Sequence, residues 1–329
     1  MTATEVAASL KRDYGKGSVK EPGQKVMEEI EAISTGCIQL DIAIGIGGFP
    51  VGRVGEIYGP ESSGKTTLVY HLLAEAQKKG PCVFIDVEHD ADASYARAIG
   101  VDWDALYFLQ PDTAEEALDA AIRFAGAGDV ALVAVDSVAE MVPKVELEGG
   151  VGDPTVAVLA RLMSKAMRII KKKTSETGTS VLFTNQIREK IGVVFGSPET
   201  QPGGRGLKFA SSVRMDIRRK EMIGIGNEST ANRVKIKVVK NKVGAPNREA
   251  DFEITYGIGI DKVAAVLDLT TDDKQPGYVP DLVSKAGKYF TFDAHGGAKV
   301  ASRAEATQFL NDNPEVAADL YQKILEANQ

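Results

Sequence analysis

The sequence predicts an α/β protein in which a mostly parallel, twisted sheet carries helices on both faces. Short β-rich runs alternate with segments of helical length through the first half of the chain, and this alternation is typical of a parallel sheet. From Val234 two strands follow one another without an intervening helix, which indicates an antiparallel edge, and a smaller mixed region begins after about Asp261. We therefore expect an N-terminal helical arm at residues 1–26, an α/β core at 27–261 and a small α+β domain at 262–329.

Length and composition indicate a globular protein. The chain has 329 residues, of which 43% are hydrophobic and 26% charged, and no run approaches the ~20 apolar residues of a membrane-spanning helix. The first residues carry charges where a signal peptide needs an apolar stretch, and Cys37 and Cys82 are the only cysteines, so we expect a cytoplasmic protein with reduced thiols. The three histidines and two cysteines lack the spacing of a zinc site.

Local patterns predict the individual elements. Ala7, Leu10 and Tyr14 repeat at helical spacing and are followed by Gly15, which predicts the helix of the arm. β-Branched and apolar runs predict strands at residues 54–58, 82–86, 130–135, 181–184, 234–239 and 252–256. Longer helix-favouring segments predict crossover helices at 66–79, 114–125 and 156–173. In the C-terminal region we expect a strand at 289–292 and helices at 280–286 and from Ser302 onward.

The charges are segregated along the chain. Residues 161–248 hold 20 Lys and Arg against 6 Asp and Glu, whereas the rest of the chain holds 19 against 40. A continuous basic stretch inside an acidic protein indicates a polyanionic partner, of which nucleic acid is the commonest. The alternative is that these charges only form solvated faces.

A phosphate-binding loop is the strongest signal. The motif G-x-x-x-x-G-K-[ST] follows one predicted strand and opens a predicted helix, so backbone N–H groups and the helix N-terminus converge on phosphate oxygens. Lys65 would reach the β- and γ-phosphates of ATP, and the Thr66 hydroxyl would bind Mg²⁺. The alternative, a glycine-rich turn that happens to hold a lysine, does not account for the flanking strand and helix. The nucleotide-contacting residues expected here are Gly59, Pro60, Glu61, Ser62, Ser63, Gly64, Lys65, Thr66 and Thr67.

Acidic residues at strand ends complete this predicted site. Asp136 follows the apolar run 130–135 and would face the magnesium shell, unless it only forms an Asx turn. Glu88 ends another strand and is a candidate to deprotonate the attacking water; Asp86 is the alternative, one step further from the sheet edge. Asp92 and Tyr95 are candidates to contact a purine base, although such a tyrosine is more often a packing residue.

Several segments together resemble the bacterial RecA family of DNA strand-exchange recombinases. The resemblance runs with few gaps from about Lys11 to Glu315, and its most specific motifs lie at residues 33–67, 84–102, 133–143, 184–196 and 233–246. It implies that Glu88 is the catalytic glutamate, that Lys65 assists catalysis, and that Asp136 holds magnesium through water. It further implies that Asp92 and Tyr95 contact adenine. Gln186, at the end of a predicted strand, matches the residue that senses the γ-phosphate.

The resemblance also implies DNA contacts, in two loops at about residues 148–157 and 187–201. The primary DNA-binding positions that it implies are Arg161, Ser164, Arg168, Arg188, Gly203 and Gly204. A second, weaker DNA site would include Arg219, Lys235 and Lys237, for which the alternative is an exposed strand face protected by charge against edge pairing. The lysine run 171–173 is interpreted as a solvated helix end.

Subunit contacts are implied as well. Lys240 and Lys242 match lysines that reach the nucleotide of the adjacent subunit, and Lys208, Phe209 and Arg214 match further interface positions. The arm would serve polymerisation, because a head-to-tail contact that does not close produces an open helical filament.

Two stretches depart from the usual pattern of the family. In the first loop, residues 152–156, including Pro154 and Thr155, differ from the residues usual in the family. In the second loop, Glu189 stands where an apolar residue is common, so whether these positions contact DNA stays open. The chain also stops where relatives often continue into an acidic tail, and we expect easier duplex binding as a result.

The expected function is therefore that of a DNA-dependent ATPase in DNA recombination, repair and the SOS response to damage. It would use ATP and Mg²⁺ to form filaments on single-stranded DNA, pair it with homologous duplex and promote strand exchange at the nucleoid, with a self-cleaving repressor as a further candidate partner. Two alternatives remain at this point. One is a hexameric helicase or packaging motor with the same phosphate-binding loop, and the other is a non-catalytic DNA scaffold whose state is switched by nucleotide binding.

Overall fold

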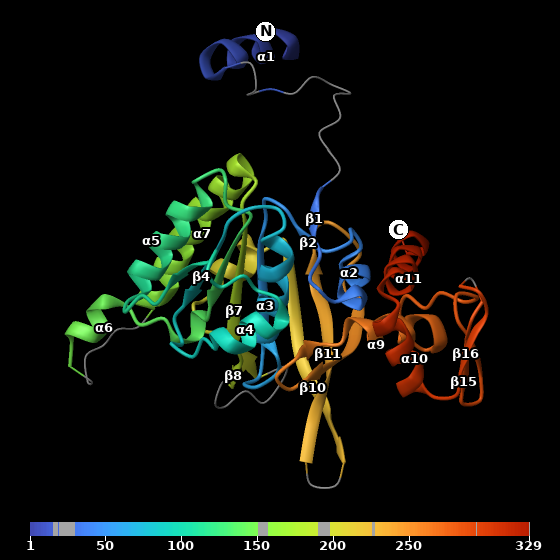
Figure 1. Cartoon of the computed structure of the whole chain (residues 1–329). Coiled ribbons are helices and arrows are strands. Elements are labelled where there is room, and N and C mark those ends of the chain that lie inside the picture. The colour runs from blue at the N-terminus through green and yellow to red at the C-terminus, as the bar shows by residue number, and fades with distance from the viewer. Residues whose placement is uncertain are drawn as a thin grey trace. The chain divides into compact units, whose positions relative to one another are not determined.

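The structure is a computed structural model that describes residues 1–15, 19, 30–150, 157–189, 198–225, 228–293 and 295–328. It divides into two compact units, Met1–Glu31 and Ala32–Gln329, and each is described by itself. Figure 1 labels the elements along the chain. The domain boundaries expected after residues 26 and 261 stay a prediction.

The first unit contains the predicted helix of the arm. Helix α1 (Ala3–Tyr14) begins with a capping box, in which the Glu5 backbone N–H donates to Thr2 Oγ1 and the Thr2 backbone N donates to Glu5 Oε2. It ends at Gly15, whose φ of 93° suits a residue without a side chain. The helix prediction and its C-terminal end are confirmed.

The second unit is built on a nine-stranded sheet with the order β13-β12-β11-β10-β3-β7-β6-β4-β5. The strands from β10 to β5 pair in parallel, and those from β10 to β13 pair in antiparallel fashion. This confirms the expected parallel sheet with an antiparallel edge. The strands are β3 (Val54–Gly59), β4 (Cys82–Asp86), β5 (Tyr107–Leu109), β6 (Leu132–Asp136), β7 (Ser180–Gln186), β10 (Val213–Ile225), β11 (Glu228–Asn241), β12 (Glu249–Thr255) and β13 (Gly259–Ile260).

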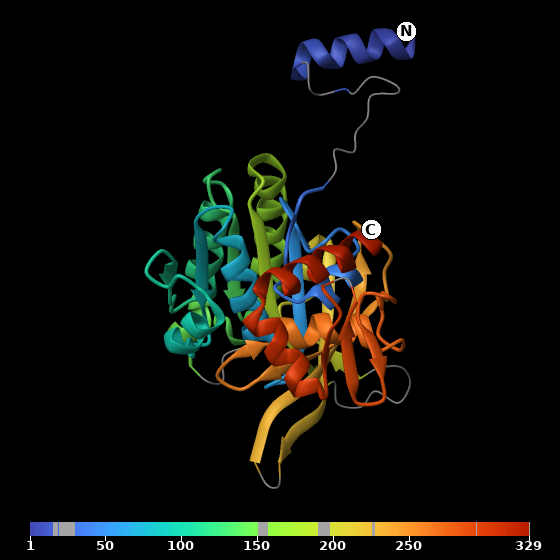
Figure 2. The same cartoon turned by 45° about the vertical axis from the view of Figure 1, so that its right-hand side comes forward.

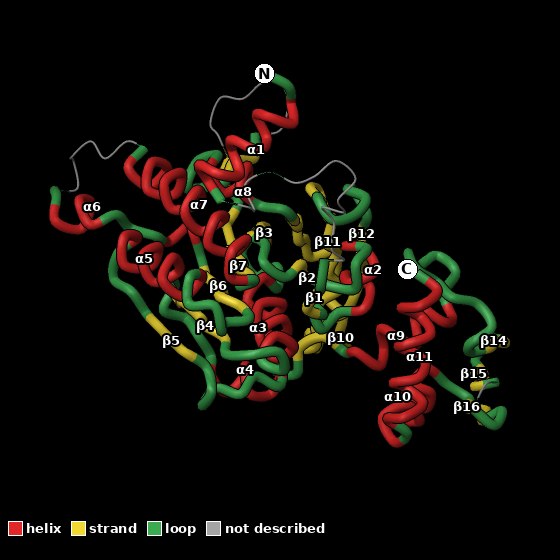
Figure 3. The backbone as a smooth tube through the Cα atoms, turned by 90° about the horizontal axis from the view of Figure 1, so that it is seen from above, coloured by secondary structure: helices red, strands yellow, loops and turns green. Residues whose placement is uncertain are grey.

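Helices cover both faces of this sheet, as predicted. One buried cluster joins Leu68 and Leu72 of α3 to Phe84 of β4, and another joins Leu118 of α5 to Val133 of β6. Figure 3 shows α5 and α7 on the side of the sheet away from α3. The helices around the sheet are α2 (Ile38–Ile44), α3 (Lys65–Ala76), α4 (Ala93–Ile99), α5 (Ala114–Ala125), α6 (Lys144–Glu148), α7 (Val158–Thr177) and α8 (Gly206–Ala210), with a 3₁₀ turn at Val138–Glu140. Short strands pair outside the large sheet: β1 (Ala32–Ile33), β2 (Phe49–Pro50), β8 (Arg188–Glu189) and β9 (Glu199–Thr200).

Strand β10, which forms a long hairpin with β11, is the main element that the sequence analysis missed, whereas the strand expected at 234–239 lies within β11. It extends well beyond the other strands (Figures 1 and 2). Only Val213–Asp216 of β10 pairs with β3, and the rest of the strand pairs with β11 alone. Its outer half is rich in charges, such as Arg218 and Lys220, because it is not buried between helices. The apolar run that marks an interior strand is therefore absent there.

The C-terminal region is a small α+β group beside the antiparallel end of the sheet (Figure 3). Its elements are α9 (Lys262–Thr271), β14 (Ser284–Ala286), β15 (Tyr289–Phe292), β16 (Ala298–Val300), α10 (Arg303–Asp312) and α11 (Pro314–Ala327). Phe292, Leu310 and Leu320 share a buried cluster there. The strand at 289–292 is confirmed, but the helix expected at 280–286 is wrong. The chain turns instead at Asp281, whose φ of 65° is incompatible with a right-handed helix, and then forms β14.

The two cysteines are buried free thiols, and burial raises the pKa of Cys82 to about 12 and that of Cys37 further. Neither thiol is therefore a nucleophile at neutral pH. Among the residues that the structure describes, none of the helices is long and apolar enough to span a membrane.

A buried histidine predicts acid sensitivity of the fold. His71 of α3 is 3% exposed and its Nε2 accepts the backbone N–H of Ile260 at 2.8 Å, and burial lowers its pKa to about 4. The unfolded chain binds a proton near pH 6.5, so stability is lost as the pH falls from there toward 4. We expect His71→Gln to remove about 2 kcal/mol of the loss in unfolding free energy between pH 7 and pH 5. Urea unfolding of both proteins at the two pH values measures this, and an equal pH dependence would contradict it.

Candidate nucleotide and nucleic-acid site

The predicted phosphate-binding loop joins β3 to the N-terminus of α3. Gly64 has a φ of 95°, and a side chain at Gly59 would come within 2.2 Å of the Ile217 carbonyl oxygen, so both positions favour glycine. Lys65 Nζ lies over the loop and donates to the carbonyl oxygen of Pro60 at 2.8 Å. Burial lowers the pKa of Lys65, while the nearby Asp136 and Glu88 carboxylates oppose this shift. The loop thus combines a cation with a helix N-terminus, as anion binding requires.

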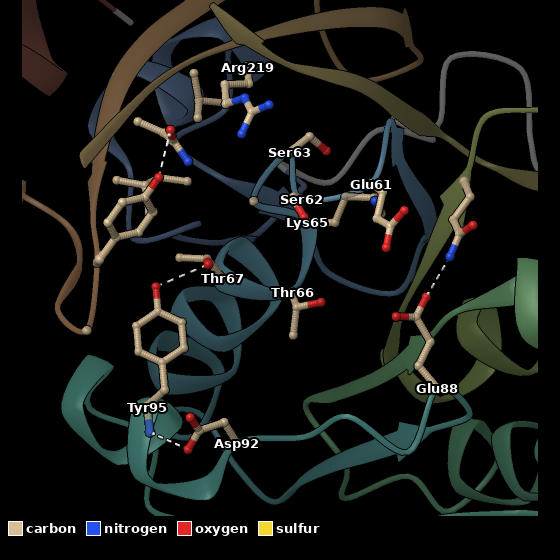
Figure 4. Close-up of a pocket in the computed structure, with 17 residues that line it drawn as sticks. Glu61, Ser62, Ser63, Lys65, Thr66, Thr67, Glu88, Asp92, Tyr95 and Arg219 are labelled. Carbon is tan, nitrogen blue, oxygen red and sulfur yellow. Dashed lines mark hydrogen bonds between the residues drawn. The ribbon is translucent and has the colours of Figure 1, made fainter. Parts of the chain in front are cut away.

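A cavity of about 650 Å³ opens over this loop (Figure 4). That volume is typical of a site for a small molecule. Loop residues 61–67 line it, Glu88 lies on one side, and Asp92 and Tyr95 lie on another; Gln186 also lines it and is hydrogen-bonded to Glu88. The structure therefore brings most of the predicted nucleotide residues together around one cavity, whereas Gly59, Pro60 and Asp136 lie next to it without lining it.

Asp136 lies at the end of β6, next to the loop. Its carboxylate is 3% exposed and accepts hydrogen bonds from the hydroxyls of Thr66, at 2.6 Å, and of Thr184. Burial raises the pKa of Asp136 to about 6, although both hydrogen bonds oppose the shift. Thr184 was missed by the sequence analysis, where its only signal was a hydroxyl residue in an otherwise apolar run.

Thr66 and Asp136 fit the predicted magnesium site. Mg²⁺ prefers hard oxygen ligands, keeps several waters and needs only one or two protein ligands beside the phosphates. Within the described ranges, no group of three His, Cys, Asp or Glu side chains is placed to hold a metal on its own. The hydroxyl and carboxylate pair therefore suits an ion that arrives with the nucleotide.

Glu88 and Asp86 have different environments. Glu88 lines the cavity, and its Oε1 accepts a hydrogen bond from Gln186 Nε2 at 3.2 Å (Figure 4). Asp86 is 2% exposed and accepts hydrogen bonds from Gln110 Nε2 and from the Ala91 backbone N–H. The geometry favours Glu88 over Asp86 as the base, because only Glu88 faces the cavity.

The predicted base-binding residues lie at the start of α4. Asp92 caps this helix, and hydrogen bonds from Ser94 and from the Tyr95 backbone lower its pKa. The Tyr95 hydroxyl lies 3.1 Å from Thr67 Oγ1. Tyr256 and Asn232 also line the cavity, and the Tyr256 hydroxyl donates to Asn232 Oδ1 at 3.0 Å; sequence analysis named neither residue as part of the site.

The predicted primary DNA positions lie around α7 and the chain that follows β9. Arg161, Ser164 and Arg168 are exposed on α7. Gly203 and Gly204 have φ values of 80° and 73°, and a side chain at Gly204 would come within 2.8 Å of the Ala160 side chain, so this backbone passes close to α7. A sixth position, Arg188, pairs with Glu140 at 3.2 Å.

Parts of both predicted DNA loops, residues 151–156 and 190–197, lie outside the described residues. The divergent positions Pro154 and Thr155 fall there. Glu189 is exposed in β8, opposite Glu199 of β9.

The three residues predicted for a second DNA site do not share one surface. Arg219 is paired with Val234 in the hairpin, and both line the nucleotide cavity. Lys235 and Lys237 alternate with Val234, so they lie on the opposite face, where Lys235 pairs with Glu249 at 2.6 Å. Lys235 and Lys237 remain together, and Arg219 belongs with the nucleotide cavity.

The lysines predicted to act between subunits lie away from their own nucleotide cavity, and neither lines it. Lys240 is paired with Arg214, on the amino-terminal side of β3, and donates to the carbonyl oxygens of Lys208 and Phe209. Burial, with Lys242, Arg214 and Lys171 nearby, lowers the pKa of Lys240 to about 8. Lys242 and Phe209 are exposed.

Arg214 forms a buried link between strands and the second predicted loop. It is 4% exposed, and its Nε donates to Glu56 Oε2 at 2.5 Å while a second nitrogen donates to Gln201 Oε1 at 2.9 Å. Asn185 Nδ2 contacts both Glu56 Oε1 and the carbonyl oxygen of Pro202. The residue that follows Asn185 is Gln186, so a chain of hydrogen bonds joins the nucleotide cavity to the far end of the loop.

Comparison with known proteins agrees with this site. A family model described as the RecA N-terminal domain matches residues 2–261. The protein RecA of Salinispora tropica is 47% identical over 97% of this chain and 89% of its own length. That of Clostridium tetani is 48% identical over 99% and 91%, and that of Acidiphilium cryptum is 50% identical over 96% and 90%. The chain therefore belongs to the RecA family, whose members are DNA-dependent ATPases that recombine homologous DNA.

Proposed function

We propose that this recombinase binds ATP with Mg²⁺ in the cavity over residues 59–67 and uses it to control a filament on single-stranded DNA. The observation that carries the proposal is the convergence of Lys65, Thr66 and Glu88 on one cavity, with the Asp136 carboxylate directly behind Thr66 and hydrogen-bonded to it. These are the groups that phosphoryl transfer to water requires: a cation, a metal-side carboxylate and a base.

Each group has a defined task in hydrolysis. The loop amides and Lys65 bind the β- and γ-phosphates, and Tyr95 stacks on the base above Asp92. Thr66 and, through water, Asp136 would hold Mg²⁺, which neutralises negative charge on the phosphates when bound. Glu88 accepts a proton from water as the water oxygen attacks the γ-phosphorus, and the bond to ADP breaks.

Gln186 connects this chemistry to DNA binding. Its amide donates to Glu88, and a γ-phosphate oxygen would be a competing acceptor. A shift of Gln186 would move the start of the segment 187–201, whose far end is held by Arg214 and Asn185. ATP would then favour one arrangement of the segment, and this difference in population sets DNA affinity.

The DNA contacts of this proposal follow the basic stretch of the chain. Arg161, Ser164, Arg168 and Arg188 would bind phosphates, and the backbone of residues 203–204 would approach them closely. Lys235 and Lys237 would hold the second strand more weakly. Because the chain belongs to the RecA family, we also propose that it acts at the nucleoid and that its filament stimulates a self-cleaving repressor.

Three measurements on the wild-type protein test the proposal. ATP turnover is expected to rise when single-stranded DNA is added, and circular single strands should exchange with homologous linear duplex. Electron microscopy with ATP and single-stranded DNA should show an open helix. A closed ring would favour a helicase or packaging motor, and turnover that ignores DNA would contradict the coupling.

A further inference from the structure

The exposed side of α7 carries more positive charge than the predicted DNA contacts account for. Arg161, Lys165, Arg168 and Lys172 follow one another at spacings of four, three and four residues, which places them on one side of the helix. All four are exposed, and we call them the α7 stripe. Arg161 and Arg168 have predicted DNA roles, whereas Lys165 and Lys172 have none.

Two hollows flank the α7 stripe. One, of about 350 Å³, is lined by Arg53, Arg168, Lys171 and Lys172, beside Gly52 and Ser212. The other, of about 570 Å³, is lined by Lys165, Lys173 and again Arg168 and Lys172. Glu176 is the one acidic residue lining either hollow in the described part of the chain. Both hollows are therefore suited to an anionic ligand.

Helix electrostatics alone does not explain the α7 stripe. Lysines near the C-terminus of a helix are favoured by its dipole, and Lys172 also pairs with Glu176 at 3.8 Å. Lys165 lies in the first half of α7, where the dipole gives a cation no advantage. Arg161 with Lys165 and Arg168 with Lys172 are like-charge pairs four residues apart, which weaken a helix. A bound anion would remove this repulsion.

We propose that Lys165, Lys172, Lys171 and Arg53 bind phosphodiester groups of single-stranded DNA, continuing along α7 the path that begins at Arg161. This inference rests on the proposed function and adds a contact surface to it. From Arg161 to Lys172 the helix rises by about 16 Å, at 1.5 Å per residue. In double-stranded DNA each strand presents a phosphate about every 3.4 Å along the helix axis, and on this scale the α7 stripe is long enough to contact more than one phosphate. Lysine and arginine contacts of this kind do not depend on base sequence.

The nucleotide of a neighbouring protomer is the main competing ligand. Lys171 is close enough to Lys240 to contribute to lowering its pKa, and Lys240 is predicted to reach that nucleotide. The α7 stripe itself begins at Arg161, however, and Ser164 lies beside it on α7, and both are predicted DNA contacts. Continuity with the predicted DNA path therefore favours DNA over the nucleotide.

The salt dependence of DNA binding tests the α7 stripe. The variant is Lys165→Gln with Lys172→Gln, because glutamine keeps a good helix propensity and removes only the charge. The control is Lys78→Gln with Lys144→Gln, which lowers the net charge by the same amount at exposed sites on other helices or their ends. The probe is a labelled oligothymidine, bound in the presence of a non-hydrolysable ATP analogue at about 50 to about 300 mM salt, the range in which counterion release is read.

We expect the slope of log affinity against log salt to become shallower by about 1.4 in the α7-stripe variant, which is about 0.7 for each single-strand phosphate that a lysine no longer neutralises. The control should keep the wild-type slope. An unchanged slope in the α7-stripe variant overturns this inference but leaves the proposed function intact. An equal change of the slope in the control also overturns the inference, because the slope then depends on the overall charge of the protein and not on contacts made by the α7 stripe. If the α7-stripe variant binds the ATP analogue more weakly but keeps the wild-type salt slope for DNA, the two hollows are nucleotide-binding sites, and the inference is overturned. If wild type itself fails to bind the oligothymidine, the proposed function falls and this inference with it.

Discussion

Glu88→Gln is expected to lower DNA-stimulated ATP turnover about 10²- to 10⁴-fold, the contribution of a general base. Glutamine has the same shape as glutamate and can still accept the hydrogen bond from Gln186, but it does not take up the proton of the attacking water. ATP and DNA should therefore still bind. Single-turnover hydrolysis at saturating single-stranded DNA measures the chemical step, and the lifetime of the DNA complex should increase because hydrolysis is what releases it.

Asp86→Asn is the matched control for this variant. Asp86 is the last residue of β4, two positions before Glu88, but it is buried against Gln110 and the Ala91 backbone rather than exposed to the cavity. We expect a loss of thermal stability with turnover of the folded protein close to wild type. If Asp86→Asn abolishes the chemical step and Glu88→Gln does not, the base is assigned to the wrong residue.

The double substitution Lys240→Ala with Lys242→Ala is expected to reduce DNA-stimulated ATP turnover by about 10³-fold, the scale of a cation supplied to phosphoryl transfer in trans. Neither lysine lines the nucleotide cavity of its own protomer. Nucleotide binding by the isolated variant should therefore be normal, and the defect should appear only on assembly. In mixed filaments each variant protomer would also inactivate the nucleotide site of a wild-type neighbour. Total ATP turnover should therefore fall more steeply than the fraction of wild-type protomers in the mixture.

Lys220→Ala is the control for the mixing experiment. Lys220 lies in the same hairpin as Lys240 and pairs with Asp251 at 2.9 Å, away from the amino-terminal end of β3. Mixing in this variant should leave turnover unchanged. A strictly proportional loss with the double lysine variant would show that the lysines act within their own protomer.

Local patterns predicted the interior of the fold well. The strand at 82–86, the helix at 114–125 and the strand at 289–292 have the observed bounds, because a buried strand or an amphipathic helix carries its own periodicity. β10 was missed because pairing with β11, rather than burial, stabilises its outer half. The helix expected at 280–286 failed because the left-handed turn at Asp281 carries no glycine to signal it.

The candidate site shows the same division. The phosphate-binding loop, Asp136 and Glu88 could be predicted to lie together because the carboxyl ends of parallel strands meet at one sheet edge. The separation of Arg219 from Lys235 depends on the strand register, which the sequence does not reveal. The link from Asn185 through Glu56 to Arg214 depends on β7, β3 and β10 being neighbours, although they are far apart in the chain.

The hydrogen bond between Gln186 and Glu88 has a consequence for ATP hydrolysis by protomers that are not assembled on DNA. In a protomer with neither DNA nor neighbours, the Gln186 amide occupies one carboxylate oxygen of Glu88, the group that is proposed to orient the attacking water. We infer that free protomers hydrolyse little ATP in the cell, and that hydrolysis begins where protomers assemble on the single-stranded DNA of a damaged region.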